Sequence, residues 1–190
     1  MCSSGLLSED GRCLKTCSSL EEQGIKEGAY LTAVARVPHV AATKKAFALW
    51  FEQGEVVAWG DPHGLLPRAP QVELLAATDY AFAAVAAGRV LAWGHAGWGG
   101  TAPKEVVEDA TTLLGNSMAF CLLRRSGEPI CWGRSVSGGR AKALGGPVTA
   151  LGATSFAFAA ATERHVHSWG LKEYGGGEVL EIEQVYEPLL

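Results

Sequence analysis

Two histidines stand two positions apart near the end of the chain, at His165 and His167. Alternate residues of a β-strand point to the same face, so a strand here would place both imidazoles on one side, as a metal site requires. No third ligand stands at a suggestive spacing. We therefore interpret the two residues as an ordinary edge-strand pair, and we predict no metal or other cofactor.

Other residues with reactive side chains also favour a structural role. Cys121 and Cys131 would occupy the two strands of one hairpin, where a redox pair and two buried free thiols are both open interpretations; the thiols, packing as small hydrophobes, are the default. Glu178, Glu181 and Glu183 are typical of a solvated face rather than of paired catalytic carboxylates. No Ser, His and Asp arrangement follows from spacing. The chain is therefore predicted not to be an enzyme.

The composition indicates many turns and little charged surface. The 190 residues include 24 Gly, and 48% are hydrophobic. Only 19% are charged, below the quarter or so that is usual in a soluble domain. The net charge is −4, and basic residues gather only as two pairs, at residues 44–45 and 124–125. Such a chain has no long-range attraction for phosphate backbones, so we predict no nucleic-acid binding.

Cysteine usage and hydropathy bear on the compartment. The five cysteines are odd in number and show no CxxC spacing, so neither a disulfide framework nor a zinc knuckle is indicated. The longest apolar stretch, residues 80–87, is far shorter than the roughly 20 residues that span a bilayer. We expect no membrane span and an intracellular, reducing compartment, either cytoplasm or nucleus, with an organelle left open.

An internal repeat is the main signal in the sequence. Trp followed by Gly recurs at Trp59, Trp93, Trp132 and Trp169, with spacings of 34, 39 and 37 residues. A Phe preceded by Ala lies eleven or twelve residues before each, in the phrases ATKKAF, ATDYAF, GNSMAF and ATSFAF. In the last three repeats two glycines follow four residues after Trp-Gly, whereas the first repeat has Leu65 and Leu66 there. Because the Ala-Phe and Trp-Gly motifs recur at a nearly constant separation, they indicate one repeated structural unit.

Each unit of about 37 residues is predicted to form three strands. The Ala-Phe strand is apolar on both faces, as in residues 81–87, which suits a strand between two neighbouring sheets. Stacked neighbours would bury those faces, so the fold class is all-β, with four propeller-like blades in an open or partial propeller. Periodic aromatics are then core residues. This predicted repeat core comprises Phe47, Trp59, Phe82, Trp93, Phe120, Trp132, Phe158 and Trp169.

At these residues the chain resembles the repeats of the regulator of chromosome condensation family. Residues 37–177 carry the resemblance, and units this short look most like the three-stranded blades of a bacterial β-lactamase inhibitory protein of that superfamily. The resemblance implies a propeller, usually of seven blades, that works by binding other proteins. It also implies two specialised roles, as an exchange factor for small GTPases or as an accessory region of ubiquitin ligases.

The leading segment, residues 1–36, resembles the second half of a ubiquitin-like domain with the β-grasp fold. Asp10 and Gly11 suit a turn, Leu14 and Leu20 are core candidates, and residues 31–34 could form the last strand. The opening hairpin and helix of such a domain are missing. Residues 178–190 are predicted to be a tail or the start of a truncated fifth repeat.

These observations predict a non-catalytic protein-interaction or scaffold module, a subunit of a larger assembly. The alternative is a regulator of a small GTPase or of ubiquitin transfer. Loops after Trp-Gly should gather on one rim of a repeat array, so the candidate partner-binding residues are His95, Trp98, Arg134 and Ser135. Four blades would also leave apolar outer faces, so we expect other subunits, or self-association through open blade edges, to cover them.

Overall fold

A computed structural model describes residues 6–12, 14, 18–33, 38–51, 56–61, 72–141 and 144–182 of the chain. The chain divides into two compact units, Met1–Pro38 and His39–Leu190. This division falls next to the predicted boundary between residues 36 and 37. Over the described ranges, no helix is long and apolar enough to cross a membrane.

The first unit holds two very short strands, β1 (Leu6–Leu7) and β2 (Thr32–Ala33), which pair in antiparallel fashion. Leu14, a predicted core residue, is 2% exposed. Leu20 is 44% exposed, against the prediction, because it starts a surface turn in which its carbonyl accepts a hydrogen bond from Gln23. One short strand pair does not establish a β-grasp fold, so the ubiquitin-like interpretation stays a prediction.

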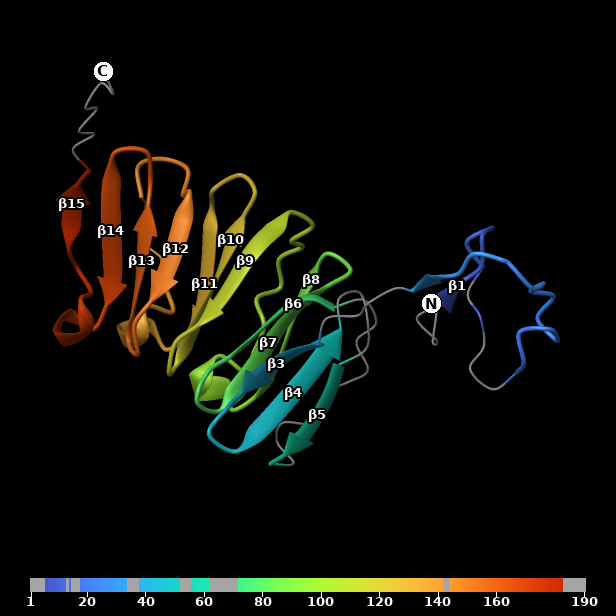
Figure 1. Cartoon of the computed structure of the whole chain (residues 1–190). Helices are drawn as coiled ribbons and strands as arrows, with labels where there is room; N and C mark the ends of the chain where they lie inside the picture. Colours follow the sequence, from blue (N-terminus) through green and yellow to red (C-terminus); the bar gives the residue numbers. More distant parts are fainter. Residues whose placement is uncertain are drawn as a thin grey trace, which may run out of the picture. The chain divides into compact units, whose positions relative to one another are not determined.

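Four small antiparallel sheets follow, which we call blades 1 to 4 (Figure 1). Within each blade the strands lie side by side in chain order. Blade 1 contains β3 (Pro38–Ala42), β4 (Ala46–Phe51) and β5 (Val56–Gly60); blade 2 contains β6 (Val72–Ala77), β7 (Ala81–Ala86) and β8 (Arg89–Gly94). Blade 3 contains β9 (Ala110–Gly115), β10 (Ala119–Arg124) and β11 (Pro129–Gly133); blade 4 contains β12 (Ala150–Ala153), β13 (Ala157–Ala161), β14 (His165–Gly170) and β15 (Val179–Glu181). The prediction of an all-β fold built from four repeats is confirmed.

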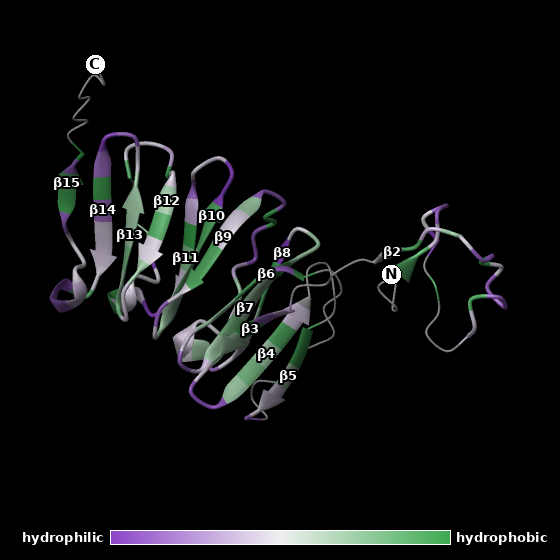
Figure 2. Cartoon of the chain, viewed as in Figure 1, coloured by the Kyte–Doolittle hydropathy of each residue, from purple (hydrophilic) through white to green (hydrophobic). Residues whose placement is uncertain are grey.

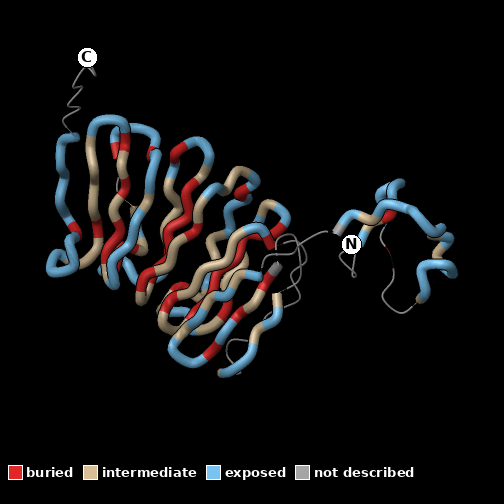
Figure 3. The backbone as a smooth tube through the Cα atoms, viewed as in Figure 1, coloured by how far each residue is buried: buried red, intermediate tan, exposed pale blue. Residues whose placement is uncertain are grey.

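The central strands of blades 2 and 3 are covered on both faces, as their continuous apolar sequences predict. Every residue of β7 is buried. Its Phe82 and Ala84 pack with Ala48 of blade 1, whereas Ala83 packs with Phe120 of blade 3. Figure 3 shows buried stretches along these central strands. Each core cluster therefore contains residues from the facing sides of two adjacent blades.

The periodic Phe and Trp of each repeat are direct cross-strand partners in the central and following strands. Their ring centroids lie 5.6, 5.3, 5.2 and 6.0 Å apart in blades 1 to 4. In blades 2, 3 and 4 the pair is buried against the preceding blade. Such aromatic pairs contribute more than their buried area alone, so they stabilise each junction between blades.

The first pair departs from the predicted core. Phe47 is 46% exposed and Trp59 is 48% exposed, although their rings stack as in the other blades. The reason is their position: Ala46 and Ala48 on the opposite face of β4 pack on blade 2, so Phe47 points away from every other described blade. The repeat period identifies the pair, but only a neighbouring sheet would bury it.

Hydrogen bonds also join consecutive blades. The backbone N–H of Lys44 donates to the carbonyl of Asp79, Asp79 donates to Ser117, and Ser117 donates to Ser155, at 2.9 to 3.1 Å. Each of these residues lies three positions before the periodic Phe of its repeat. The chain of hydrogen bonds therefore passes once from each blade to the next.

Indole groups add a second polar contact at two junctions. The Nε1–H of Trp132 donates to the Gly99 carbonyl, and that of Trp169 donates to the Gly138 carbonyl, both at 3.0 Å. Each acceptor belongs to the loop of the preceding blade. A buried indole N–H needs a hydrogen-bond acceptor, and the loop of the preceding blade provides it.

The structure corrects two further predictions. Cys121 and Cys131 are joined by a disulfide, not free thiols, because they are direct cross-strand partners in β10 and β11. Val179 to Glu181 form β15, which pairs with β14 as a fourth strand of blade 4. This segment was predicted to be a tail or the start of a fifth repeat. Residues 183–190, which include the rest of that prediction, lie outside the described residues.

Candidate protein-binding rim

Three short 3₁₀-helices follow the Trp-Gly strands of blades 2, 3 and 4: η2 (Ala96–Trp98), η3 (Ser135–Ser137) and η4 (Lys172–Tyr174). Each ends at a glycine with left-handed backbone geometry. Because β8, β11 and β14 hold equivalent places in their blades, the three loops lie along the same edge (Figure 1). We call this edge, with residues 95–98, 134–137 and 171–174, the rim.

A polar side chain anchors each of these loops, and this side chain is buried in blades 2 and 3 but exposed in blade 4. Thr78 Oγ1 donates to the Trp98 carbonyl at 2.9 Å, Asn116 Nδ2 to the Ser137 carbonyl at 2.7 Å, and Thr154 Oγ1 to the Tyr174 carbonyl at 2.9 Å. The same side chains accept a hydrogen bond from the backbone N–H of the first residue of the Phe strand. The rim loops are therefore held by their own blades.

The sequence analysis missed these anchors, although a signal was present. A Thr or Asn stands four residues before each periodic Phe, at Thr43, Thr78, Asn116 and Thr154. Both residue types bond readily to nearby backbone groups in turns. Because a Thr or Asn recurs at this position in all four repeats, the repeat pattern could have suggested that these side chains bond to the backbone of a turn.

A second row of side chains contacts the rim from the turns before the Phe strands. Tyr80 meets Trp98 edge-on with ring centroids 5.3 Å apart, and Phe156 meets Tyr174 in the same way at 4.7 Å. In blade 3 the equivalent residue is Met118, whose Sδ lies 3.5 Å from Nη1 of Arg134. These residues stand two positions before the periodic Phe, a further signal that the sequence analysis did not use.

The predicted residues of blade 2 come together on the rim. His95 is exposed, and its Nδ1 accepts a hydrogen bond from the Gly97 N–H at 3.1 Å. Its ring lies edge-on to Trp98, with centroids 4.2 Å apart. Trp98 is partly buried against the core shared by blades 2 and 3, and its indole Nε1 makes no hydrogen bond with the described residues. The Trp98 ring is therefore held from two sides, by His95 and Tyr80.

The predicted residues of blade 3 are more accessible. Arg134 and Ser135 are both exposed, next to Val136, which is 53% exposed. On blade 4 the exposed aromatic is Tyr174, at 44%. Arg, Trp and Tyr are the residues that most often carry the binding energy of protein interfaces. The rim therefore presents suitable side chains on three consecutive blades.

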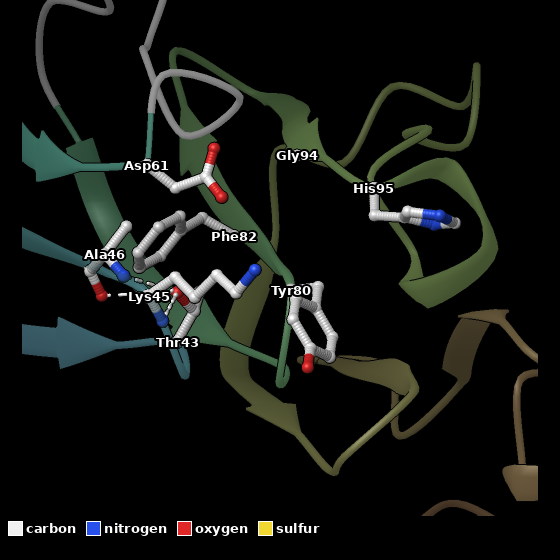
Figure 4. A pocket seen from close by; sticks show the side chains of 8 residues that line it. All are labelled: Thr43, Lys45, Ala46, Asp61, Tyr80, Phe82, Gly94 and His95. Carbon is white, nitrogen blue, oxygen red and sulfur yellow. Dashed lines mark hydrogen bonds between the residues drawn. The ribbon is translucent and has the colours of Figure 1, made fainter.

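Blades 1 and 2 enclose a cavity of about 320 Å³ at the same edge. Figure 4 shows Phe82 at its centre, with Lys45 and Asp61 beside the ring and His95 turned away. In blades 3 and 4 the equivalent Phe ring is covered by Gly99 and Gly138. The corresponding residues of the first repeat lie outside the described residues, and we assign the cavity no ligand.

An ion pair links blades 1 and 2 near this cavity. Lys44 Nζ lies 2.6 Å from the Asp79 carboxylate and 5.7 Å from the centre of the Tyr80 ring. The hydrogen bond to Asp79 raises the pKa of Lys44. Because the lysine side chain is 59% exposed, solvent screens the pair, and we expect it to orient the turn more than to stabilise the fold.

The other chemically suggestive residues do not assemble into a site. His165 and His167 share one face of β14 with ring centroids 5.7 Å apart. Within the part of the chain that the structure describes, no three or more His, Cys, Asp or Glu side chains could hold a metal ion. Glu178 and Glu181 are exposed, and Glu183 lies outside the described residues.

Comparison with solved structures places this architecture among known folds. The CRINKLY WD40 ectodomain of the receptor kinase ACR4 from Arabidopsis thaliana superimposes with a TM-score of 0.54 at 22% identity, over 75% of this chain and 55% of that one. The ectodomain of the receptor kinase CR4 from Physcomitrella patens gives a TM-score of 0.56 at 20% identity, over 73% of this chain and 43% of that one. Yeast RCC1 (Prp20), crystallised with Kap60, gives 0.51 at 16% identity, over 79% and 48%. The blades have the β-propeller fold.

This propeller-fold chain spans about half the length of the structures that it resembles. Their sequence identities, at 22% or less, establish the fold and not the function. No protein-family model matches the chain, and no curated protein matches it. The similarity to yeast RCC1 agrees with the resemblance that the Trp-Gly repeats indicate.

Proposed function

We propose that this propeller-fold chain is a non-catalytic protein-binding module that contacts its partner through the rim. The observation that carries the proposal is the series of anchored loops, which present Trp98, Arg134 and Tyr174 from three consecutive blades. Side chains held in place before binding lose little conformational entropy when a partner docks. A row of such side chains is therefore suited to recognising a protein surface.

Two solved structures of one neighbour, yeast RCC1 (Prp20), support a role in protein binding. Yeast RCC1 is seen bound to Kap60, and Prp20p from Saccharomyces cerevisiae is described with its binding properties to Gsp1p and histones. The low fraction of charged residues and the acidic net charge favour a protein over a nucleic acid as the partner. Protein binding, within a larger assembly, accounts for the rim without requiring any catalytic group.

The second candidate function is regulation of a small GTPase or of ubiquitin transfer. It is supported by the resemblance to chromosome-condensation repeats and by the ubiquitin-like pattern of residues 1–36. Both candidates predict a bound protein, and they differ in its identity. Recovery of a GTPase or of a ubiquitin-conjugation component as the captured partner would favour this second function.

Affinity capture from the native source, using the full chain, tests the rim. Wild type is compared with an Arg134→Ala, Tyr174→Ala variant and with a Trp98→Ala, Arg134→Ala variant. The matched control is Arg125→Ala, an exposed arginine in the hairpin turn at the opposite end of β10. Loss of two interface anchors should reduce capture by about tenfold or more.

The control should retain its partner, and the thermal melts of the control and of the Arg134→Ala, Tyr174→Ala variant should match that of wild type. The Trp98→Ala, Arg134→Ala variant should melt lower, because Trp98 also packs on the core shared by blades 2 and 3. Equal capture by the rim variants and the control would place the binding surface elsewhere and contradict the proposal.

A further inference from the structure

The outer face of blade 1 is an exposed apolar surface. Cross-strand partners point to the same side of a sheet, so Leu49 and Val57 share one face with Phe47 and Trp59. Val40 of β3 points the same way, because its neighbour His39 stacks on Trp50 of the opposite face. We call these five residues the leading face. Val57 is 58% exposed and Val40 is 62% exposed. Figure 2 shows hydrophobic stretches on β4 and β5, and an exposed apolar patch of this kind marks an interaction site.

The outer face of blade 4 has a different character. On β13, Phe158 and Ala160 pack on blade 3, so Ala157, Ala159 and Ala161 form the opposite face. Their cross-strand partners on that face include Gly152, Val166 and Ser168. We call these six residues the trailing face. Its central side chains are small and could receive larger rings, and Leu180 of β15, the cross-strand partner of Val166, lies at its edge.

The junctions inside the chain show what such a face accepts. Ala81 and Ala83 hold the places in blade 2 that Ala157 and Ala159 hold in blade 4. Ala83 is fully buried because Phe120 of the next blade packs in the same core, whereas Ala159 is only partly buried. Ala157, like Ala81, is already buried within its own blade. The leading face carries the equivalent Phe, and the trailing face carries the equivalent alanines. The two end faces are therefore the two halves of one interface that the chain repeats internally.

Glycines of the rim loops provide a more specific match. A Cβ atom placed on Gly99 would lie 2.6 Å from Cδ2 of Phe120, and one on Gly138 would lie 2.7 Å from Cδ2 of Phe158. Gly175 is the equivalent residue of blade 4, with nearly the same backbone angle, φ +86°, yet its Cβ would meet nothing within 4 Å. The position for an incoming Phe ring at Gly175 is therefore open.

Polar groups continue the same pattern. Gly99 and Gly138 accept hydrogen bonds from the Trp132 and Trp169 indoles, so the Gly175 carbonyl is the equivalent acceptor for a Trp of an added blade. The chain of backbone hydrogen bonds from Lys44 ends with the Ser155 carbonyl as acceptor. The Ser155 N–H is thus the next donor in the series, and the Lys44 carbonyl is the matching acceptor.

We propose that the leading face of one copy docks on the trailing face of a second copy, and that two copies close into a ring of eight blades. In this ring Phe47 of the first copy packs on Gly175 of the second copy, and the Trp59 indole N–H of the first copy donates to the Gly175 carbonyl. The backbone N–H of Ser155 in the second copy donates to the Lys44 carbonyl of the first. Propellers close with roughly four to eight blades, so a ring of eight lies within the range. A head-to-tail contact that closes gives a finite oligomer. Tyr174 of the rim adjoins Gly175, whereas Trp98 and Arg134 lie on blades 2 and 3. The Trp98→Ala, Arg134→Ala variant therefore tests the rim independently of this junction.

Sedimentation equilibrium of the full chain tests the ring, with an expected mass of twice 20.0 kDa. Gly175→Asn is the decisive variant: Asn tolerates left-handed geometry, and the added side chain meets nothing within one chain but would collide with Phe47 of the second copy. Gly177→Asn is the matched control, since Gly177 has φ +94° and open space. Its equivalents in blades 2 and 3, Thr101 and Arg140, are exposed.

The expected result is a dimer for wild type and for Gly177→Asn, and a folded monomer for Gly175→Asn. A Phe47→Asp, Trp59→Asp variant should also be a folded monomer, and mixing it with Gly175→Asn should restore a dimer through the one intact junction. A wild-type monomer, growth beyond two copies, or equal behaviour of the two glycine variants would overturn the proposal.

Discussion

Replacing Trp132 by Ala removes a ring that is 8% exposed, stacks on Phe120 at 5.2 Å and donates a hydrogen bond to Gly99. Large-to-small changes of this kind in a core cost about 3–5 kcal/mol of unfolding free energy. Trp59 occupies the same place in blade 1 but is 48% exposed. Within one chain its replacement by Ala loses mainly the stack on Phe47, which contributes about 1 kcal/mol.

Urea titration followed by far-ultraviolet circular dichroism measures the contrast. With a slope of about 2 kcal/mol per M, Trp132→Ala should lower the urea midpoint by roughly 1.5–2.5 M, and Trp59→Ala by roughly 0.5 M. The protein must be dilute enough to be monomeric, because assembly would stabilise the wild type by mass action. Exposed Lys104 provides a control for substitution to Ala. Equal losses for Trp132 and Trp59 would refute the assignment of one to a junction and the other to an open face.

Asn116→Ala should cost about 2–4 kcal/mol, because three hydrogen bonds of 2.7 to 2.9 Å are lost in a buried turn, and Asn116→Thr should recover part of the loss; chemical denaturation compares them. The hydrogen bond from Arg124 lowers the pKa of Asp109, so the stability that this pair adds is present above the ordinary carboxyl pKa near 3.8 and is lost as pH falls through the folded-state value. The difference in urea midpoint between wild type and Asp109→Asn should shrink on acidification, and a constant difference would contradict the pairing. Cys121 and Cys131 should resist alkylation in denaturant until a reductant is added, as mass spectrometry of the peptides would show.

The repeat architecture was predictable from the sequence because its signals are local. Strand, turn and Trp-Gly recur in each unit, and the two-faced apolar pattern of residues 81–87 already requires a sheet on either side. The rim residues followed from the same period, since equivalent loops of a repeat array share one edge. Their role in binding a partner stays a prediction.

Other features depended on distances that the sequence does not contain. The disulfide follows from the register of β10 and β11, which places Cys121 opposite Cys131. The fourth strand of blade 4 follows from the pairing of Val166 with Leu180 across a turn. A shift of one residue in either register would move every side chain of that strand to the other face, and spacing alone does not exclude it.

The sequence by itself determined that this chain repeats an all-β unit four times, with one Phe and one Trp in each, because the period of the pattern is independent of how the units pack. Only the tertiary structure decided which of these aromatics is buried. Phe47 and Phe120 have the same local sequence role, yet one is 46% exposed and the other is fully buried. The difference arises because burial belongs to a pair of neighbouring sheets, and Phe120 has blade 2 against it whereas Phe47 faces away from every described blade.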